Sequence, residues 1–121
     1  MTPEQKDTYE NLLRIIDDVE NSAKINGKHF SQLKLDRYNE ISFLCALLFS
    51  KEPTKARITV EEPTREKPFT CIRVCVDAFE LDQDNKAKFI ELINLADNVI
   101  FYGTEQNYFD ISFYVNDIWT E

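Results

Sequence analysis

The stretch CIRVCVDA, residues 71–78, decides the fold because two kinds of side chain alternate along it. Ile72, Val74, Val76 and Ala78 fall on one side of an extended chain. The other side carries Cys71, Arg73, Cys75 and Asp77. This period of two predicts a long β-strand that packs one face on an apolar core.

Residues 99–102 are expected to form another strand. Two further stretches, residues 56–61 and residues 108–115, have the same period of two, and each is also expected to form a strand. The last places Phe109, Ile111, Phe113 and Val115 on one face and Tyr108, Asp110, Ser112 and Tyr114 on the other. A polar, proline-bounded connection (62–68) and a five-residue loop (103–107) would join these strands into two hairpins.

Helical periodicity predicts three helices. Residues 2–24 begin with the Thr2, Pro3 and Gln5 pattern of a capping box and carry one apolar stripe. Glu20 falls near the edge of this stripe and needs a partner or a path to solvent. A second helix is expected from an Asp36 N-cap to about residue 50, largely buried; residues 28–35 are ambiguous between strand and loop. A third begins at residue 82 or 84, and its core side is predicted as Phe89, Ile90, Ile93 and Ala96.

The order α-α-β-β-α-β-β predicts an α+β fold, a four-stranded and mostly antiparallel sheet with helices packed on one face. A chain of 121 residues without a linker-like segment is expected to form a single domain over residues 1–121. Its composition, 43% hydrophobic and 30% charged, is that of a globular protein.

The net charge of −8 is concentrated towards the C-terminus. Residues 76–121 contain ten acidic and two basic side chains, and no Lys or Arg follows Lys88. Such a surface repels nucleic acid and anionic lipid, so direct binding to either is not expected, whereas a protein with a basic surface would be attracted. The alternative is that the charge only maintains solubility.

The N-terminus lacks the basic and apolar regions of a signal peptide, and the three cysteines, Cys45, Cys71 and Cys75, form no disulfide framework. These features predict a cytoplasmic protein. On one strand, Cys71 and Cys75 would lie about 13 Å apart, too far for a mutual disulfide or a shared zinc ion. They are expected to be small buried side chains.

The sequence lacks the residues that the common catalytic and cofactor-binding motifs require. His29 is the only histidine, and Gly27 and Gly103 stand alone, so phosphate-binding loops and histidine metal pairs are excluded. We therefore expect a non-enzymatic protein with no catalytic residues, no metal and no cofactor. The alternative is a small enzyme or ligand-binding domain that uses carboxylates near Cys75 and Asp77.

Tyrosines and acidic or hydroxyl side chains gather on and beside the last predicted hairpin. Tyrosine provides a large contact area at low entropic cost, so this segment is the predicted partner-binding site. Its members are Tyr102, Glu105, Tyr108, Asp110, Ser112, Tyr114 and Asp117. The second choice is the acidic outer face of the first helix, with Glu4, Asp7 and Asp18.

These features predict a small acidic protein-binding module. In composition it resembles immunity proteins and phage inhibitors of nucleases, which implies inhibition of a basic, nucleic-acid-processing protein. A structural or accessory subunit with an apolar interface, such as that of a homodimer, is the alternative within the binding class.

Overall fold

The computed structural model describes residues 1–51, 54–76, 82–103 and 109–120. The described elements are α1 (Pro3–Lys24), α2 (Gln32–Phe49), β1 (Ser50–Lys51), β2 (Thr54–Lys55), β3 (Arg57–Glu61), β4 (Thr70–Val76), α3 (Gln83–Leu95), β5 (Asn98–Gly103) and β6 (Phe109–Val115). The predicted order of three helices and four strands is confirmed, and the short β1–β2 pair is an addition to it.

The four strands form an antiparallel sheet in the order β3-β4-β6-β5. The two central strands are β4 and β6, the strands with the longest alternating patterns. Val74 lies opposite Ile58 on one side and Ile111 on the other, so the apolar side chains of neighbouring strands fall on the same face.

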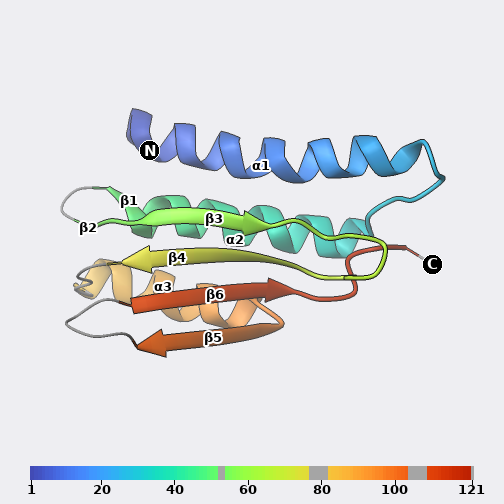
Figure 1. The fold of residues 1–121 in the computed structure, drawn as a ribbon. Helices are drawn as coiled ribbons and strands as arrows, with labels where there is room; N and C mark the ends of the chain where they lie inside the picture. The colour runs from blue at the N-terminus through green and yellow to red at the C-terminus, as the bar shows by residue number, and fades with distance from the viewer. Residues whose placement is uncertain (52–53, 77–81, 104–108, 121) are drawn as a thin grey trace.

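All three helices lie on the side of that apolar face, as predicted (Figure 1). Helix α2 lies in the middle and packs against both α1 and α3, as well as against β4 and β6. Its residues Ile41, Cys45 and Phe49 are fully buried, and the Phe49 ring lies 6.5 Å from that of Phe113 in β6. The apolar run in the second half of α2 is therefore the centre of the core.

Helix α1 begins with the capping box that the sequence predicted. Thr2 Oγ1 accepts a hydrogen bond from Gln5 N at 3.1 Å, and Gln5 Oε1 accepts one from Thr2 N at 2.8 Å. Gln5 is buried, and its Nε2 donates to Leu47 O in α2 at 3.0 Å. The cap thus also fixes where α1 crosses α2.

Two details of the helices differ from the prediction. Helix α2 begins at Gln32, not after Asp36, because Ser31 N donates to Ile118 O and holds the chain in place just before the helix. Asp36 instead lies inside the helix and accepts a hydrogen bond from Gln32 Nε2. In α3, Ile90 is 51% exposed and Leu92 is the fully buried residue. Residues two apart on a helix point about 200° apart, so the two cannot both face the core.

Glu20 has the partner that its position required. Its Oε2 accepts a hydrogen bond from the backbone N–H of the buried Phe30 at 2.8 Å. Phe30 also forms an isolated antiparallel bridge with Trp119, and the two rings lie 4.6 Å apart. This contact joins the connection after α1 to the C-terminal segment.

We predict that Glu20→Ala lowers the free energy of unfolding by about 1–2 kcal/mol, because it leaves the Phe30 N–H buried without an acceptor. Glu20→Gln keeps an acceptor oxygen and should lose less than half as much. Urea denaturation of both variants measures the difference, and equal losses would contradict a role for this hydrogen bond.

Candidate functional site

The face of the sheet away from the helices carries the candidate site, which we call the open face. It consists of Arg57, Thr59 and Glu61 of β3, Cys71, Arg73 and Cys75 of β4, Asp110, Ser112 and Tyr114 of β6, and Asn98, Ile100 and Tyr102 of β5. In the part of the chain that the structure describes, no helix lies over this face (Figure 1). The register arranges these side chains in three rows that cross all four strands.

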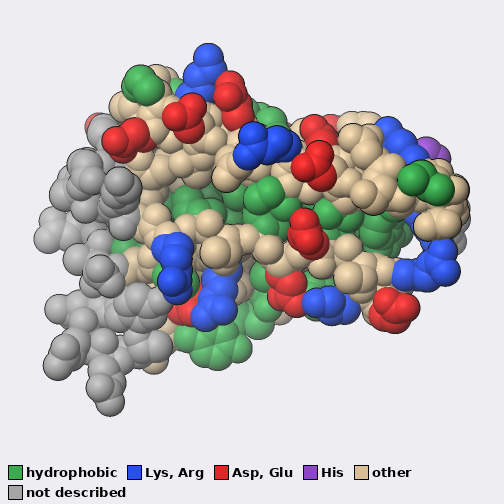
Figure 2. Space-filling view, turned by 45° about the horizontal axis from the view of Figure 1, so that its top comes forward, with side chains coloured by type: hydrophobic (Ala, Val, Ile, Leu, Met, Phe, Trp, Pro, Cys, Tyr) green, Lys and Arg blue, Asp and Glu red, His purple; other side chains and the backbone are tan. Residues whose placement is uncertain are grey.

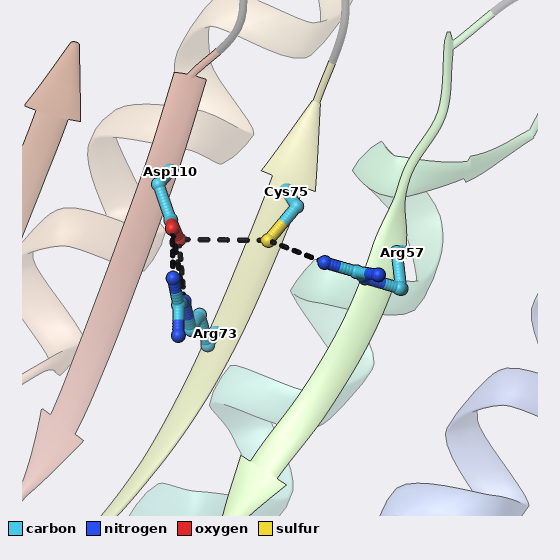
Figure 3. A network of polar contacts seen from close by, with 4 residues as sticks. All are labelled: Arg57, Arg73, Cys75 and Asp110. Atoms are coloured by element: carbon cyan, nitrogen blue, oxygen red, sulfur yellow. Dashed lines mark hydrogen bonds and ion pairs between the residues drawn. The ribbon is translucent and has the colours of Figure 1, made fainter. Parts of the chain in front are cut away.

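One row contains a buried carboxylate held by an arginine (Figure 3). Asp110 is only 4% exposed. Arg73 Nε, from the neighbouring row, donates to both carboxylate oxygens of Asp110, at 2.8 and 3.0 Å, and Arg73 Nη2 also donates to Oδ2. Paired donors in one plane match the two carboxylate oxygens, which makes this ion pair geometrically specific.

The thiol of Cys75 lies between Asp110 and Arg57 (Figure 3). Its Sγ is 3.6 Å from Asp110 Oδ1 and 4.0 Å from Arg57 Nη2. Cys71, four residues before Cys75 on the same face, has its Sγ 3.6 Å from Glu61 Oε2. Both thiols are buried, as predicted, but they are buried on the open face and not in the core beneath the helices.

The electrostatics of the open face favour charged carboxylates at Asp110 and Glu61 and a neutral thiol at Cys71. The hydrogen bonds from Arg73 lower the pKa of Asp110, and the hydrogen bond from Lys67 lowers that of Glu61. Burial, together with the nearby Glu61 carboxylate, raises the pKa of Cys71 to about 11. A thiol with that pKa is almost entirely protonated at neutral pH, so Cys71 is a poor nucleophile.

The structure brings four of the predicted binding residues together. Asp110, Ser112 and Tyr114 alternate onto the open face as expected, and Tyr102 lies opposite Asp110 on β5. Of these, Tyr102 is 57% exposed and Tyr114 is half-buried against the Phe69 ring, whereas Asp110 and Ser112 are buried. Asp110 therefore supports the surface and is covered by its neighbours.

The other predicted residues lie elsewhere. Asp117 follows β6 as an exposed residue with a φ of 51°, outside the sheet. Glu4, Asp7 and Asp18 are exposed on α1, away from the open face. Glu105, Tyr108 and Asp77 lie outside the described residues.

Sequence reasoning missed the contributions of β3 and β4, above all Arg57, Thr59 and Arg73. The alternation in β4 had placed Arg73 opposite the apolar side chains, but only the pairing of β4 with β6 shows that it lies beside Asp110. A basic residue and an acidic residue on the outward faces of two predicted central strands is the signal that could have suggested the pair.

Among the described residues, no group of three or more His, Cys, Asp or Glu side chains is placed to hold a metal ion. No helix within the described ranges is both long and apolar enough to cross a membrane. Comparisons with protein-family models, with curated proteins and with solved structures found no match to this chain.

We predict that Arg73→Met lowers the free energy of unfolding by about 1–3 kcal/mol, because it leaves the Asp110 carboxylate buried without the guanidinium that pairs with it. The double variant Arg73→Met/Asp110→Asn should lose less than the sum of the single variants. Chemical denaturation of all four proteins gives the coupling energy, and additive losses would contradict the pair.

The same pair predicts a pH dependence. Because the pKa of Asp110 is lower in the folded state, the unfolded chain binds more protons as the pH falls. The contribution of Asp110 is complete above about pH 5 and is lost on acidification below the unfolded value of about 3.9. The stability difference between the wild-type protein and Asp110→Asn should therefore shrink from pH 6 to pH 3, and a constant difference would contradict this account.

Proposed function

We propose that the protein is a non-enzymatic protein-binding module and that its open face contacts the partner. The observation that carries this proposal is the exposed ring of Tyr102 on the same face as the half-exposed side chain of Arg73. Tyrosine and arginine are the residue types that dominate the energetic centres of protein interfaces. Half-buried Ile100 and Tyr114 add apolar area between and beside them.

The construction of the open face supports a binding role. Its buried polar atoms have partners within the face, since Asp110 is bound by Arg73 and the Cys71 thiol lies 3.6 Å from Glu61 Oε2. The underlying apolar layer belongs to α2 and the opposite side of the strands. The exposed side chains can therefore contact a partner without any change in the core, and a rigid surface loses little entropy on binding.

The partner is proposed to carry a basic surface, and inhibition of a nucleic-acid-processing protein is the specific form of this proposal. On the open face itself, Arg73 pairs with Asp110 and Lys67 with Glu61, so the charges there are largely balanced. The net charge of −8 therefore arises mostly from other surfaces. In this proposal, the negative charge attracts the basic partner over a distance, and the tyrosines of the open face make the direct contact.

A second candidate is an accessory subunit with an apolar interface. Phe101 and Phe109, on the helix side of β5 and β6, are 54% and 43% exposed. Two large apolar rings exposed on adjacent strands favour a self-association surface. Sedimentation equilibrium of the wild-type protein and of Phe101→Ser distinguishes this candidate, which requires a dimer that the substitution dissociates.

We predict that substitutions on the open face abolish partner capture. Tagged wild-type protein, Tyr102→Ala and Thr59→Arg are used to capture partners from the native host, and the amounts retained are compared by mass spectrometry. Each variant should retain at least ten-fold less of the specific partner, because loss of an interface anchor costs about 2 kcal/mol or more. Raising the salt concentration should also weaken capture, since exposed charges are screened.

Matched controls are available on the helices. Leu33→Ala removes an exposed apolar side chain from α2, and Asn21→Arg adds the same charge to α1. Both should capture the partner as the wild type does, with all variants confirmed as folded by thermal melting. Equal capture by open-face variants and controls would overturn the proposed site.

A further inference from the structure

A groove runs between α1 and the edge strand β3. At one end, a depression of about 340 Å³ is lined by Glu4, Asp7, Leu12 and Ile15 of α1 and by Ala56 and Ile58 on the β3 side. At the other end, a depression of about 260 Å³ is lined by Val19 and Ala23 of α1 and by Pro63, Arg65 and Trp119. Figure 2 shows the hollow between the two elements, with hydrophobic side chains at its base.

The β3 wall of this groove is the outer edge of the sheet. Strand β3 pairs with β4 on one side, and within the described residues no strand pairs with its other side. An edge strand presents backbone N–H and C=O groups that can bind a further strand. An extended peptide can add to such an edge, and its alternate side chains then enter pockets on one face.

The length and the apolar lining of the groove suit a peptide of this kind. The stretch of α1 from Glu4 to Ser22 spans about 27 Å at 1.5 Å per residue. That length matches about eight residues of extended chain. Apolar side chains of the added strand would face Leu12, Ile15 and Ile58.

The charges at the two ends of the groove differ. Glu4 and Asp7 line the end near the start of β3, and Lys28 and Arg65 line the end beyond it. Antiparallel pairs outnumber parallel ones, and an antiparallel strand would place its C-terminal end beside Glu4 and Asp7. This arrangement is complementary to lysine or arginine near the C-terminal end of the bound segment.

We propose that the groove binds an extended segment of a partner protein as a fifth strand antiparallel to β3, whose groove-facing side chains are apolar along most of its length and basic near its C-terminal end. This inference goes beyond the function proposed above, because it concerns the edge of the sheet and does not use the open face. In this proposal, Glu4 and Asp7 of α1 select basic side chains at one end of the groove.

The test uses a fluorescein-labelled nonapeptide in which the first three groove-facing positions are valine, the last two groove-facing positions are lysine, and the positions between them are polar and uncharged. Fluorescence anisotropy at low salt should show saturable binding, and the amide NMR signals that shift should belong to Arg57–Glu61 and to the groove side of α1. Glu4→Gln/Asp7→Asn should weaken binding at least five-fold. The matched control Glu10→Gln/Asp17→Asn removes the same charge from exposed positions of α1 that do not line the groove and should change it less than two-fold.

Peptides that are N-methylated at alternate residues test the backbone contact. Methylation in the phase that faces β3 should abolish binding, and methylation in the other phase should not. The proposal is overturned if the peptide binds more weakly than 1 mM, if both charge variants weaken it equally, if neither phase of methylation matters, or if a second copy of the chain occupies the groove. Tyr102→Ala should leave the peptide affinity unchanged, so failure here is distinguishable from failure of the open face.

Discussion

The structure depends on the burial of one face of the sheet against helix α2. Ile41, Cys45 and Phe49 of α2 have no exposed surface, and they pack with the equally buried Val74 and Phe113 of the central strands. Burying each large apolar side chain stabilises the fold by about 1.5–3 kcal/mol relative to exposure, so this layer contributes strongly to the stability. Because α1 and α3 also pack against α2, all the helices gather on one side.

No helix among the described residues covers the other face of the sheet, and the polar side chains there form hydrogen bonds and ion pairs with one another. The Arg73–Asp110 pair, the Cys75 thiol beside it and the Glu61–Lys67 pair do so along the central and edge strands. A carboxylate that is buried at a surface needs such a partner, since an unpaired charge there would be costly. Within the described ranges, the open face is therefore held by contacts among its own side chains and not by a helix above it.

Much of the fold follows from local patterns in the sequence. The alternation in β4 and β6 predicts which side chains face the core, and the Thr2 and Gln5 pattern predicts the first turn of α1. Long-range contacts cannot be obtained in this way. The bond from Ser31 N to Ile118 O sets the start of α2, and no pattern near Ser31 reveals it.

The candidate site likewise combines features that follow from local sequence patterns with features that depend on long-range contacts. Strand alternation correctly grouped Asp110, Ser112 and Tyr114, but the exposure of each side chain depends on neighbours from other strands. Asp110 is covered because the pairing of β4 with β6 places Arg73 beside it, although the two residues are 37 positions apart in the sequence. Sequence reasoning therefore grouped the side chains of one face correctly and could not establish how exposed each of them is.

Site-specific photo-crosslinking tests the central claim most directly. A benzophenone-containing amino acid is placed at Thr59, in the middle row of the open face, and separately at Asn21 on the outer side of α1. After irradiation in the native host, the protein labelled at position 59 should form a covalent adduct with one specific partner, and the protein labelled at position 21 should not. Adducts from position 21 alone, or equal adducts from both, would contradict the assignment of the open face as the contact surface.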